Sequence, residues 1–223
     1  MKKLILSIGL ISSIFLGLNA QVKEGFINYS IEFEGLPAEQ AAMMKGMEMK
    51  SYYKNGKSRM DQSMAFGTST TITDENGNTT ILSDMMGMKK YGNMTAKDAE
   101  KLKKNKKSED PKITYLNDTK TIAGYDCKKA NVEIKTNEGE TSNTEVWYCE
   151  KLDFPKTGRN EEQFKGLKGT PLEFSMSLPQ GFKMVMKATE VSTAPVSNSK
   201  FEVSTDGYTK MSPEEMKQMG GGQ

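Results

Sequence analysis

The sequence predicts a mainly β fold with some α: one large curved antiparallel sheet whose concave face is covered by two or three helices. Runs of alternating apolar and polar residues, about ten in all, follow one another in hairpin order and are separated by turn signals. Three segments of helix-forming composition interrupt these runs. No alternation of strands and helices, the pattern that builds a parallel sheet, is found.

The first 20 residues have the pattern of a secretory signal peptide. Lys2 and Lys3 precede an apolar run from Leu4 to Leu18, and Ala20 offers a small residue for cleavage. A run of this length is short for a membrane span. We therefore expect residues 1–20 to be removed and the protein to be periplasmic or secreted, not an integral membrane protein. The alternative is an uncleaved N-terminal anchor.

Residues 21–210 are expected to form a single β-rich domain, and residues 211–223 a short helical turn with a flexible tail. About 200 residues suit one domain with its own core. Loss of Lys2 and Lys3 lowers the formal charge from +2 to zero, which argues against nucleic-acid binding. The chain contains no histidine, the commonest general base and metal ligand. No catalytic residue and no cofactor are predicted, and the chain is interpreted as a non-enzymatic monomer.

The first half of the chain begins with a strand expected at residues 25–35, because its apolar residues alternate with polar ones. A helix should follow over residues 36–49, with Pro37 at its start. Two hairpins come next, with Asn-Gly turns at residues 55–56 and 76–77. A second helix is expected over residues 95–107, which opens with a variant of the capping box.

The only two cysteines, Cys127 and Cys149, lie in a predicted hairpin over residues 121–149. If Glu138 lies at the centre of its turn, Cys127 faces Cys149 and Ala130 faces Val146. The same register places the other apolar residues of the hairpin together on the face opposite to the cysteines, and a slip by one residue would break both patterns. In an exported chain two cysteines usually form a disulfide, so a structural bridge is predicted. The rival interpretation is a redox pair, but redox cysteines are normally close in sequence.

The second half of the chain continues with a short helix expected at residues 160–167 and a hairpin at residues 171–188. In this hairpin Phe174 should face Met186, Met176 should face Met184, and all the apolar residues share one side. One more short strand is expected within residues 200–208, and a helical turn after Ser212-Pro213.

Five blocks of the sequence resemble marker blocks of exported Bacteroidota proteins in the uncharacterised GLPGLI-related group: EFEGLPAEQAAMM, YYKNGKSRM, KTIAGYDCKKA, VWYCEKLDFP and DGYTKM. That group is similar in architecture to the outer-membrane lipoprotein carriers. The resemblance implies an incomplete antiparallel β-barrel, closed by helices around an apolar cavity. It carries over no catalytic residue. Cys149, which follows Trp147-Tyr148, departs from the pattern of the group.

Methionines are unusually frequent, and the sequence has 17 of them. Met43 and Met47, four residues apart, would share one stripe of the first helix. If this helix covers the sheet, it would form with the 171–188 hairpin either an ordinary core or a cavity for lipid or lipoprotein acyl chains. The residues predicted to line that cavity are Met43, Met47, Phe174, Met176, Leu178, Phe182, Met184 and Met186.

Two other functions remain open. Clustered thioethers suit Cu(I), which predicts a copper carrier as the alternative. Its candidate ligands are Met43, Met44, Met47, Met49, Met85, Met86 and Met88. A third possibility is an envelope interaction protein with no small ligand, which would use the exposed edges of its sheet.

Overall fold

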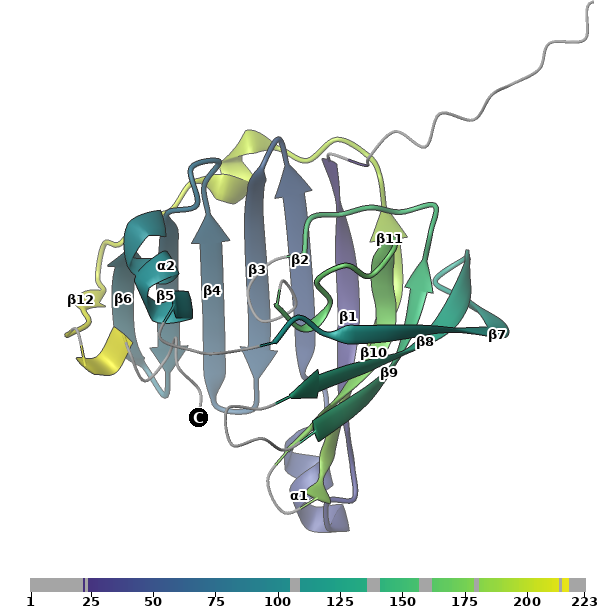
Figure 1. Ribbon diagram of the computed structural model, residues 1–223. Helices are drawn as coiled ribbons and strands as arrows, with labels where there is room; N and C mark the ends of the chain where they lie inside the picture. The colour runs from purple at the N-terminus through teal and green to yellow at the C-terminus, as the bar shows by residue number, and fades with distance from the viewer. Residues whose placement is uncertain are drawn as a thin grey trace, which may run out of the picture.

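The computed structural model describes residues 22, 24–104, 109–135, 141–156, 162–178, 181–212 and 214–216. Within these residues twelve strands form one sheet, in the order β12-β6-β5-β4-β3-β2-β1-β11-β10-β9-β8-β7 (Figure 1). The strands are β1 (Glu24–Glu34), β2 (Glu48–Lys54), β3 (Lys57–Met64), β4 (Gly67–Thr73), β5 (Thr79–Met85), β6 (Met88–Met94), β7 (Lys112–Ile122), β8 (Tyr125–Lys135), β9 (Thr141–Cys149), β10 (Thr170–Ser177), β11 (Lys183–Ser192) and β12 (Thr209–Lys210). The helices are α1 (Ala38–Met43), α2 (Ala96–Lys104) and the 3₁₀ helix η2 (Asn198–Phe201).

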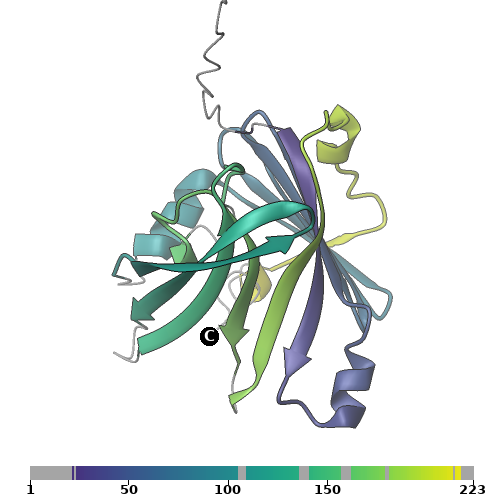
Figure 2. The same ribbon diagram turned by 90° about the vertical axis from the view of Figure 1, so that its right-hand side faces the viewer.

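The fold class predicted from the sequence is confirmed. All neighbouring strands in the described sheet are antiparallel except β12, which runs parallel to β6. The sheet curls about its middle, so that β7, β8 and β9 turn over the side on which α2 lies (Figures 1 and 2). Its two outer strands, β12 and β7, do not pair, so the sheet stays unclosed.

Both predicted hairpin registers are confirmed. In β8 and β9, Ala130 is the partner of Val146, and the last pair of the ladder is Lys128 with Tyr148. One further step in the same register places Cys127 opposite Cys149. In β10 and β11, Phe174 is the partner of Met186 and Met176 that of Met184. Each register is fixed because it keeps the apolar residues of both strands on one face.

The predicted turn between β2 and β3 is also found. Asn55 and Gly56 have φ angles of 48° and 82°, the left-handed values that a two-residue hairpin turn needs and that Asn-Gly adopts readily. Lys54 and Lys57 close the hairpin as partners.

The capping box of α2 is present as predicted. The Thr95 hydroxyl oxygen accepts from the Asp98 backbone N–H at 3.2 Å, and the same hydroxyl donates to the Asp98 carboxylate at 2.7 Å. The first bond gives a partner to one of the backbone N–H groups that a helix start otherwise leaves without one, and the second joins the two side chains. The Thr95 and Lys101 contacts lower the pKa of Asp98.

Two predicted elements are wrong: the first helix is shorter than expected, and a strand near the C-terminus is replaced by other structure. The first helix ends at Met43, because Gly46 turns the chain with a φ of 79° and the alternating residues after it form β2. Met47 therefore does not share a helical stripe with Met43. The strand expected within residues 200–208 is replaced by η2, which Ser197 caps by accepting from the Ser199 N–H, and by a turn at Gly207.

Other expected features fall partly or wholly outside the described residues. Residues 1–20, where the signal peptide is expected, are outside them, as are residues 157–161 at the start of the expected 160–167 helix. Glu162 and Gln163 are helical, and a turn follows them. The helical turn expected after Ser212-Pro213 is found at residues 214–216. No helix in the described part of the chain is long and apolar enough to span a bilayer.

The core lies on the concave side of β1 and β8–β11. The connection between β9 and β10 folds back over this face and inserts Phe154 and Phe164, which are 1% and 0% exposed. Phe164 meets Phe174 edge-on at 4.9 Å between ring centroids, and Phe154 stacks on Tyr53 at 5.0 Å. A side chain at Gly25 would lie 2.8 Å from the Phe154 ring, so this close approach requires glycine.

Candidate functional site

The residues predicted to line an apolar cavity do not all come together. Phe174 and Met186 are 1% and 3% exposed and belong to the main core. Met47, Met176 and Met184 lie at the margin of that core and are partly buried against it.

The other predicted lining residues lie farther out. Leu178 and Phe182 are half-buried at the end of the β10–β11 hairpin, where the Leu178 N–H donates to the Phe182 carbonyl at 2.8 Å. Met43 is 59% exposed, and α1 has no buried residue. Helix α1 lies beyond the lower end of β1 and β2 in the view of Figure 1, while α2 lies over the concave side. The predicted pairing of α1 with the 171–188 hairpin is therefore not seen.

On the concave face of β2–β6, many inward side chains are smaller or more polar than those of the core. Register partners share a face of a sheet, so successive partners form rows across these five strands. The inward positions of β4 carry only small side chains. The three upper rows are Tyr53-Ser58-Thr73-Thr79-Met94, Ser51-Met60-Thr71-Ile81-Gly92 and Met49-Gln62-Ser69-Ser83-Lys90.

The lowest row of this face is rich in methionine. Met64 is the partner of Gly67, Gly67 of Met85, and Met85 of Met88. The register of β2 with β3, extended one residue past Glu48 and Ser63, places Met47 opposite Met64. We call Met47, Met64, Met85 and Met88 the methionine row. The sequence pattern did not single out Met64, because only the pairing of β3 with β4 brings it beside the others.

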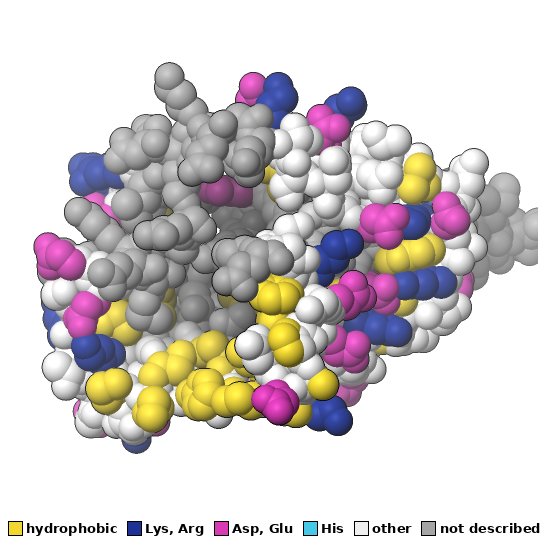
Figure 3. Space-filling model, turned by 90° about the horizontal axis from the view of Figure 1, so that it is seen from below, with side chains coloured by type: hydrophobic (Ala, Val, Ile, Leu, Met, Phe, Trp, Pro, Cys, Tyr) yellow, Lys and Arg dark blue, Asp and Glu magenta, His cyan; other side chains and the backbone are white. Residues whose placement is uncertain are grey.

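The lower end of the sheet exposes large hydrophobic side chains. The turns between β3 and β4 and between β5 and β6 both lie there (Figure 1), and the Met86 N–H of one donates to the Phe66 carbonyl of the other at 2.9 Å. Phe66 is 56% exposed, Met86 80% and Met88 63%. Figure 3, seen from below, shows hydrophobic side chains gathered in a band along this end. We call Met43, Phe66, Met86 and Met88 the lower rim.

The remaining methionines proposed as copper ligands are dispersed. Met49 is buried in the core at 3% exposure, whereas Met44 lies half-buried at the end of α1. Met86 occupies the β5–β6 turn with a φ of 54°. Of the seven candidates, only Met47, Met85 and Met88 lie in the methionine row.

The two cysteines are buried thiols in the structure, each 0% exposed. Burial, followed by the neighbouring Cys149, raises the pKa of Cys127 to about 11. The Cys127 thiol is thus a poor nucleophile at neutral pH, which does not favour a redox role. The predicted disulfide remains a prediction, supported by the register that places the two residues opposite each other.

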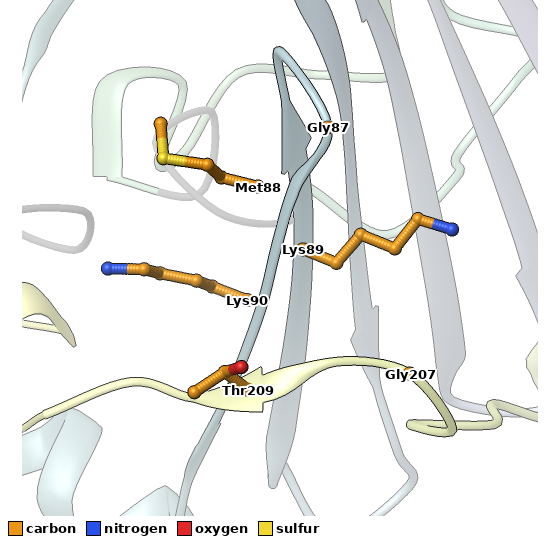
Figure 4. A pocket seen from close by; sticks show the side chains of 6 residues that line it. All are labelled: Gly87, Met88, Lys89, Lys90, Gly207 and Thr209. Carbon is orange, nitrogen blue, oxygen red and sulfur yellow. The ribbon is translucent and has the colours of Figure 1, made fainter.

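Two shallow hollows lie on the described surface. One, of about 360 Å³, is bordered by Met88, Lys89, Lys90 and Thr209. The two lysine side chains extend to opposite sides of β6 (Figure 4), and Lys90 pairs with Glu215, so the hollow has no converging positive charge. The described residues also contain no group of three or more His, Cys, Asp or Glu that could hold a metal ion.

The second hollow, of about 290 Å³, lies where a bulge interrupts the pairing of β7 with β8. Tyr115 borders it, 39% exposed, with Tyr148 5.5 Å away between ring centroids. The Lys168 Nζ lies 5.2 Å above the Tyr115 ring, and Lys128 pairs with Glu150 at 2.7 Å. This hollow therefore combines an aromatic ring with charged groups of both signs.

The fold and these surfaces define a β-rich domain with one packed core and a second, methionine-bearing face. Residues 47–160, just over half of the chain, match the sequence profile of the family described as N-glycanase peptide, N-terminal domain. The chain belongs to this family. The resemblance to the GLPGLI-related group stays a prediction.

Comparison with solved structures gives distant likenesses. Two crystal forms of PNGF-II each have a TM-score of 0.49 and 18% identity; the match covers 88% of this chain and 33% or 32% of theirs. This chain thus spans about a third of their length. A putative outer-membrane lipoprotein-sorting protein domain from Vibrio parahaemolyticus has a TM-score of 0.36 and 10% identity, over 81% of this chain and 90% of that one. No curated protein matches the sequence.

Proposed function

We propose that this chain is an exported binding domain that takes a hydrophobic ligand, such as the acyl chain of a lipid or lipoprotein, at the lower end of its curved sheet. The observation that carries the proposal is the lower rim. Within the described residues, four of the five exposed large hydrophobic side chains belong to it, and the fifth is Tyr115. Exposed apolar side chains that gather on one surface usually mark a contact site.

The composition of the rim supports a ligand of variable shape. Met43, Met86 and Met88 have flexible, polarizable side chains that adapt to different apolar partners. Met88 also ends the methionine row, so the apolar surface continues from the rim onto the concave face. A chain-like ligand could follow this surface inward, where small Ser, Thr and Gly side chains of β4 leave room between the methionines.

The test is binding of a fluorescent fatty-acid probe by the full exported chain, with Phe66 and Met86 replaced together by serine. Because both side chains lie in turns and are largely exposed, the double variant should fold normally. We expect its affinity for the probe to fall at least about tenfold, which corresponds to about 1.4 kcal/mol. Tyr115→Ser, at the other exposed hydrophobic residue, is the matched control and should bind as the wild type does. Equal binding by all three proteins, or no binding at all, would refute the proposal.

Membership of the N-glycanase family supports a second candidate, the recognition of glycans. The matched region contains Tyr115, whose hollow presents an aromatic ring beside Lys128 and Glu150. Calorimetric titration with an N-linked oligosaccharide tests it. Binding that is lost in Tyr115→Ala and kept in the Phe66/Met86 double variant would support glycan recognition over the hydrophobic-ligand proposal.

A further inference from the structure

The methionine row brings four thioethers from different strands to one edge of the concave face. Met47 precedes β2 and accepts a hydrogen bond at its carbonyl from the Ile31 N–H at 3.1 Å, which ties it to β1. Met64 ends β3, Met85 ends β5 and Met88 begins β6. Directly opposed residues of antiparallel strands have Cβ atoms about 4.5–5.5 Å apart. Met47 is therefore within reach of Met64, and Met85 within reach of Met88.

Gly67 joins these two pairs. It lies between Met64 and Met85 in the row and has no side chain to separate them. The Met85 Sδ lies 2.9 Å from the position that a Cβ on Gly67 would occupy. The thioether of Met85 thus lies close to the Gly67 backbone, and Gly67 itself places no side chain between Met85 and Met64.

The turns at this end hold the backbone of the row in place. Met86 and Gly87 form a two-residue turn with φ angles of 54° and 82°, which fixes Met85 opposite Met88. The hydrogen bond from the Met86 N–H to the Phe66 carbonyl joins this turn to the β3–β4 turn. The four residues are consequently presented by a connected backbone, while their side chains stay free to adjust.

Neutral thioether sulfur is a soft ligand, and among the metals available to proteins it selects Cu(I). We propose that Met47, Met64, Met85 and Met88 form a Cu(I)-binding site. Met88 is 63% exposed, so the metal can enter from solvent, while the other three are half-buried. The nearest charged residue in the adjoining row, Lys90, is neutralised by its pair with Glu215. The site does not depend on hydrophobic-ligand binding and adds a separate activity to the same face.

A thioether carries no proton to displace at neutral or mildly acidic pH, unlike a thiol or imidazole ligand. Cu(I) affinity should therefore change less than about threefold between pH 8 and pH 5. A site that used cysteine would weaken by orders of magnitude over this range, because each thiol must lose its proton to bind.

The experiment is an anaerobic titration of the full exported chain with Cu(I), in competition with the chromophoric chelator bicinchoninate. We expect one equivalent of Cu(I) to be withdrawn from the chelator at micromolar concentrations. The Met64→Leu/Met85→Leu double variant should lose at least about tenfold in affinity, since leucine preserves volume but removes the sulfur. Met60→Leu, on the same face but two rows higher, is the matched control and should keep wild-type affinity.

Absence of competition by the wild type would overturn the proposal. So would an equal loss in Met60→Leu, or full retention of affinity in the double variant. The two proposals fail separately, because Phe66→Ser/Met86→Ser removes neither Met64 nor Met85. That variant should still bind Cu(I) when it has lost the fatty-acid probe.

Discussion

The two halves of the sheet are built from different side chains on the same concave side. In β1 and β8–β11 the inward positions are mostly apolar and close-packed around Phe164 and Phe174. In β3–β6 they are mostly Ser, Thr, Gly and Met, with Gln62, Ile81 and Lys90 as the exceptions. A face of large apolar residues stabilises the fold by burial, whereas small polar and flexible residues contribute less. We therefore expect the first half to carry most of the stability, and the binding proposed above to use the second half.

The largest test of this contrast compares one large apolar side chain from each half. Phe174→Ala, at 1% exposure, should lower the free energy of unfolding by about 3–5 kcal/mol, because it leaves a cavity beside Phe164 and Tyr29. Met85→Ala, in the methionine row, should cost less than about 1.5 kcal/mol, since Met85 is only half-buried. Urea unfolding curves measure both. Equal losses would show that the halves share the stability.

The next effect concerns the two cysteines of the packed half. In protein recovered from an oxidising compartment, iodoacetamide under denaturing, non-reducing conditions should label no thiol. Reduction should then lower the free energy of unfolding by about 3 kcal/mol, in the chain-entropy account of a bridge that closes this loop. Two labelled thiols in the non-reduced protein would mean that Cys127 and Cys149 are simply buried side chains.

A smaller effect is expected from a polar group inside the packed half. The Tyr29 hydroxyl donates to the Pro171 carbonyl at 2.8 Å, and burial raises the pKa of Tyr29 well above its ordinary value. Tyr29→Phe should destabilise by about 1 kcal/mol in chemical unfolding, because the Pro171 oxygen loses its donor while the ring packing remains. A loss above about 3 kcal/mol would mean that the hydroxyl also organises the β1–β10 contact.

The smallest effect is a dependence on pH at the start of β1. The Glu24 carboxylate accepts from Lys54, 3.0 Å away, and from the Val196 N–H at 2.6 Å, and these contacts lower its pKa. The folded state therefore holds the Glu24 proton less tightly than the unfolded state does. The stabilisation is present above the unfolded pKa of about 4.3 and is lost as pH falls through the lower folded value.

Glu24→Gln should consequently melt slightly below the wild type at pH 7. The difference between the two melting temperatures should vanish by about pH 3, where the wild-type carboxyl is protonated. If the difference in melting temperature between Glu24→Gln and the wild type stayed the same at low pH, the destabilisation would come from packing and not from the charge of Glu24.

The sequence predicted the elements whose signals are local. Turn residues and alternation placed Asn55-Gly56 and the β8–β9 and β10–β11 registers, and the capping box placed the start of α2. The extent of α1 was overestimated because helix-forming residues continue past Gly46, where the chain instead turns into β2.

The candidate site could not be predicted to the same extent, because it depends on pairing between distant residues. Met64 and Gly67 became relevant only when the strand order placed them beside Met85. The burial of Phe174 follows from Phe164, which arrives from the β9–β10 connection and has no local signal of its own. Periodicity shows which residues share a face, but not what covers that face.

Hydrophobic-ligand binding is tested most directly by native mass spectrometry of the protein purified gently from the cell envelope. A population shifted by the mass of one acyl lipid is expected, and its loss in the Phe66→Ser/Met86→Ser variant would locate the ligand at the lower rim. A wild-type protein that carries no lipid, even after incubation with membrane extract, would contradict the proposal.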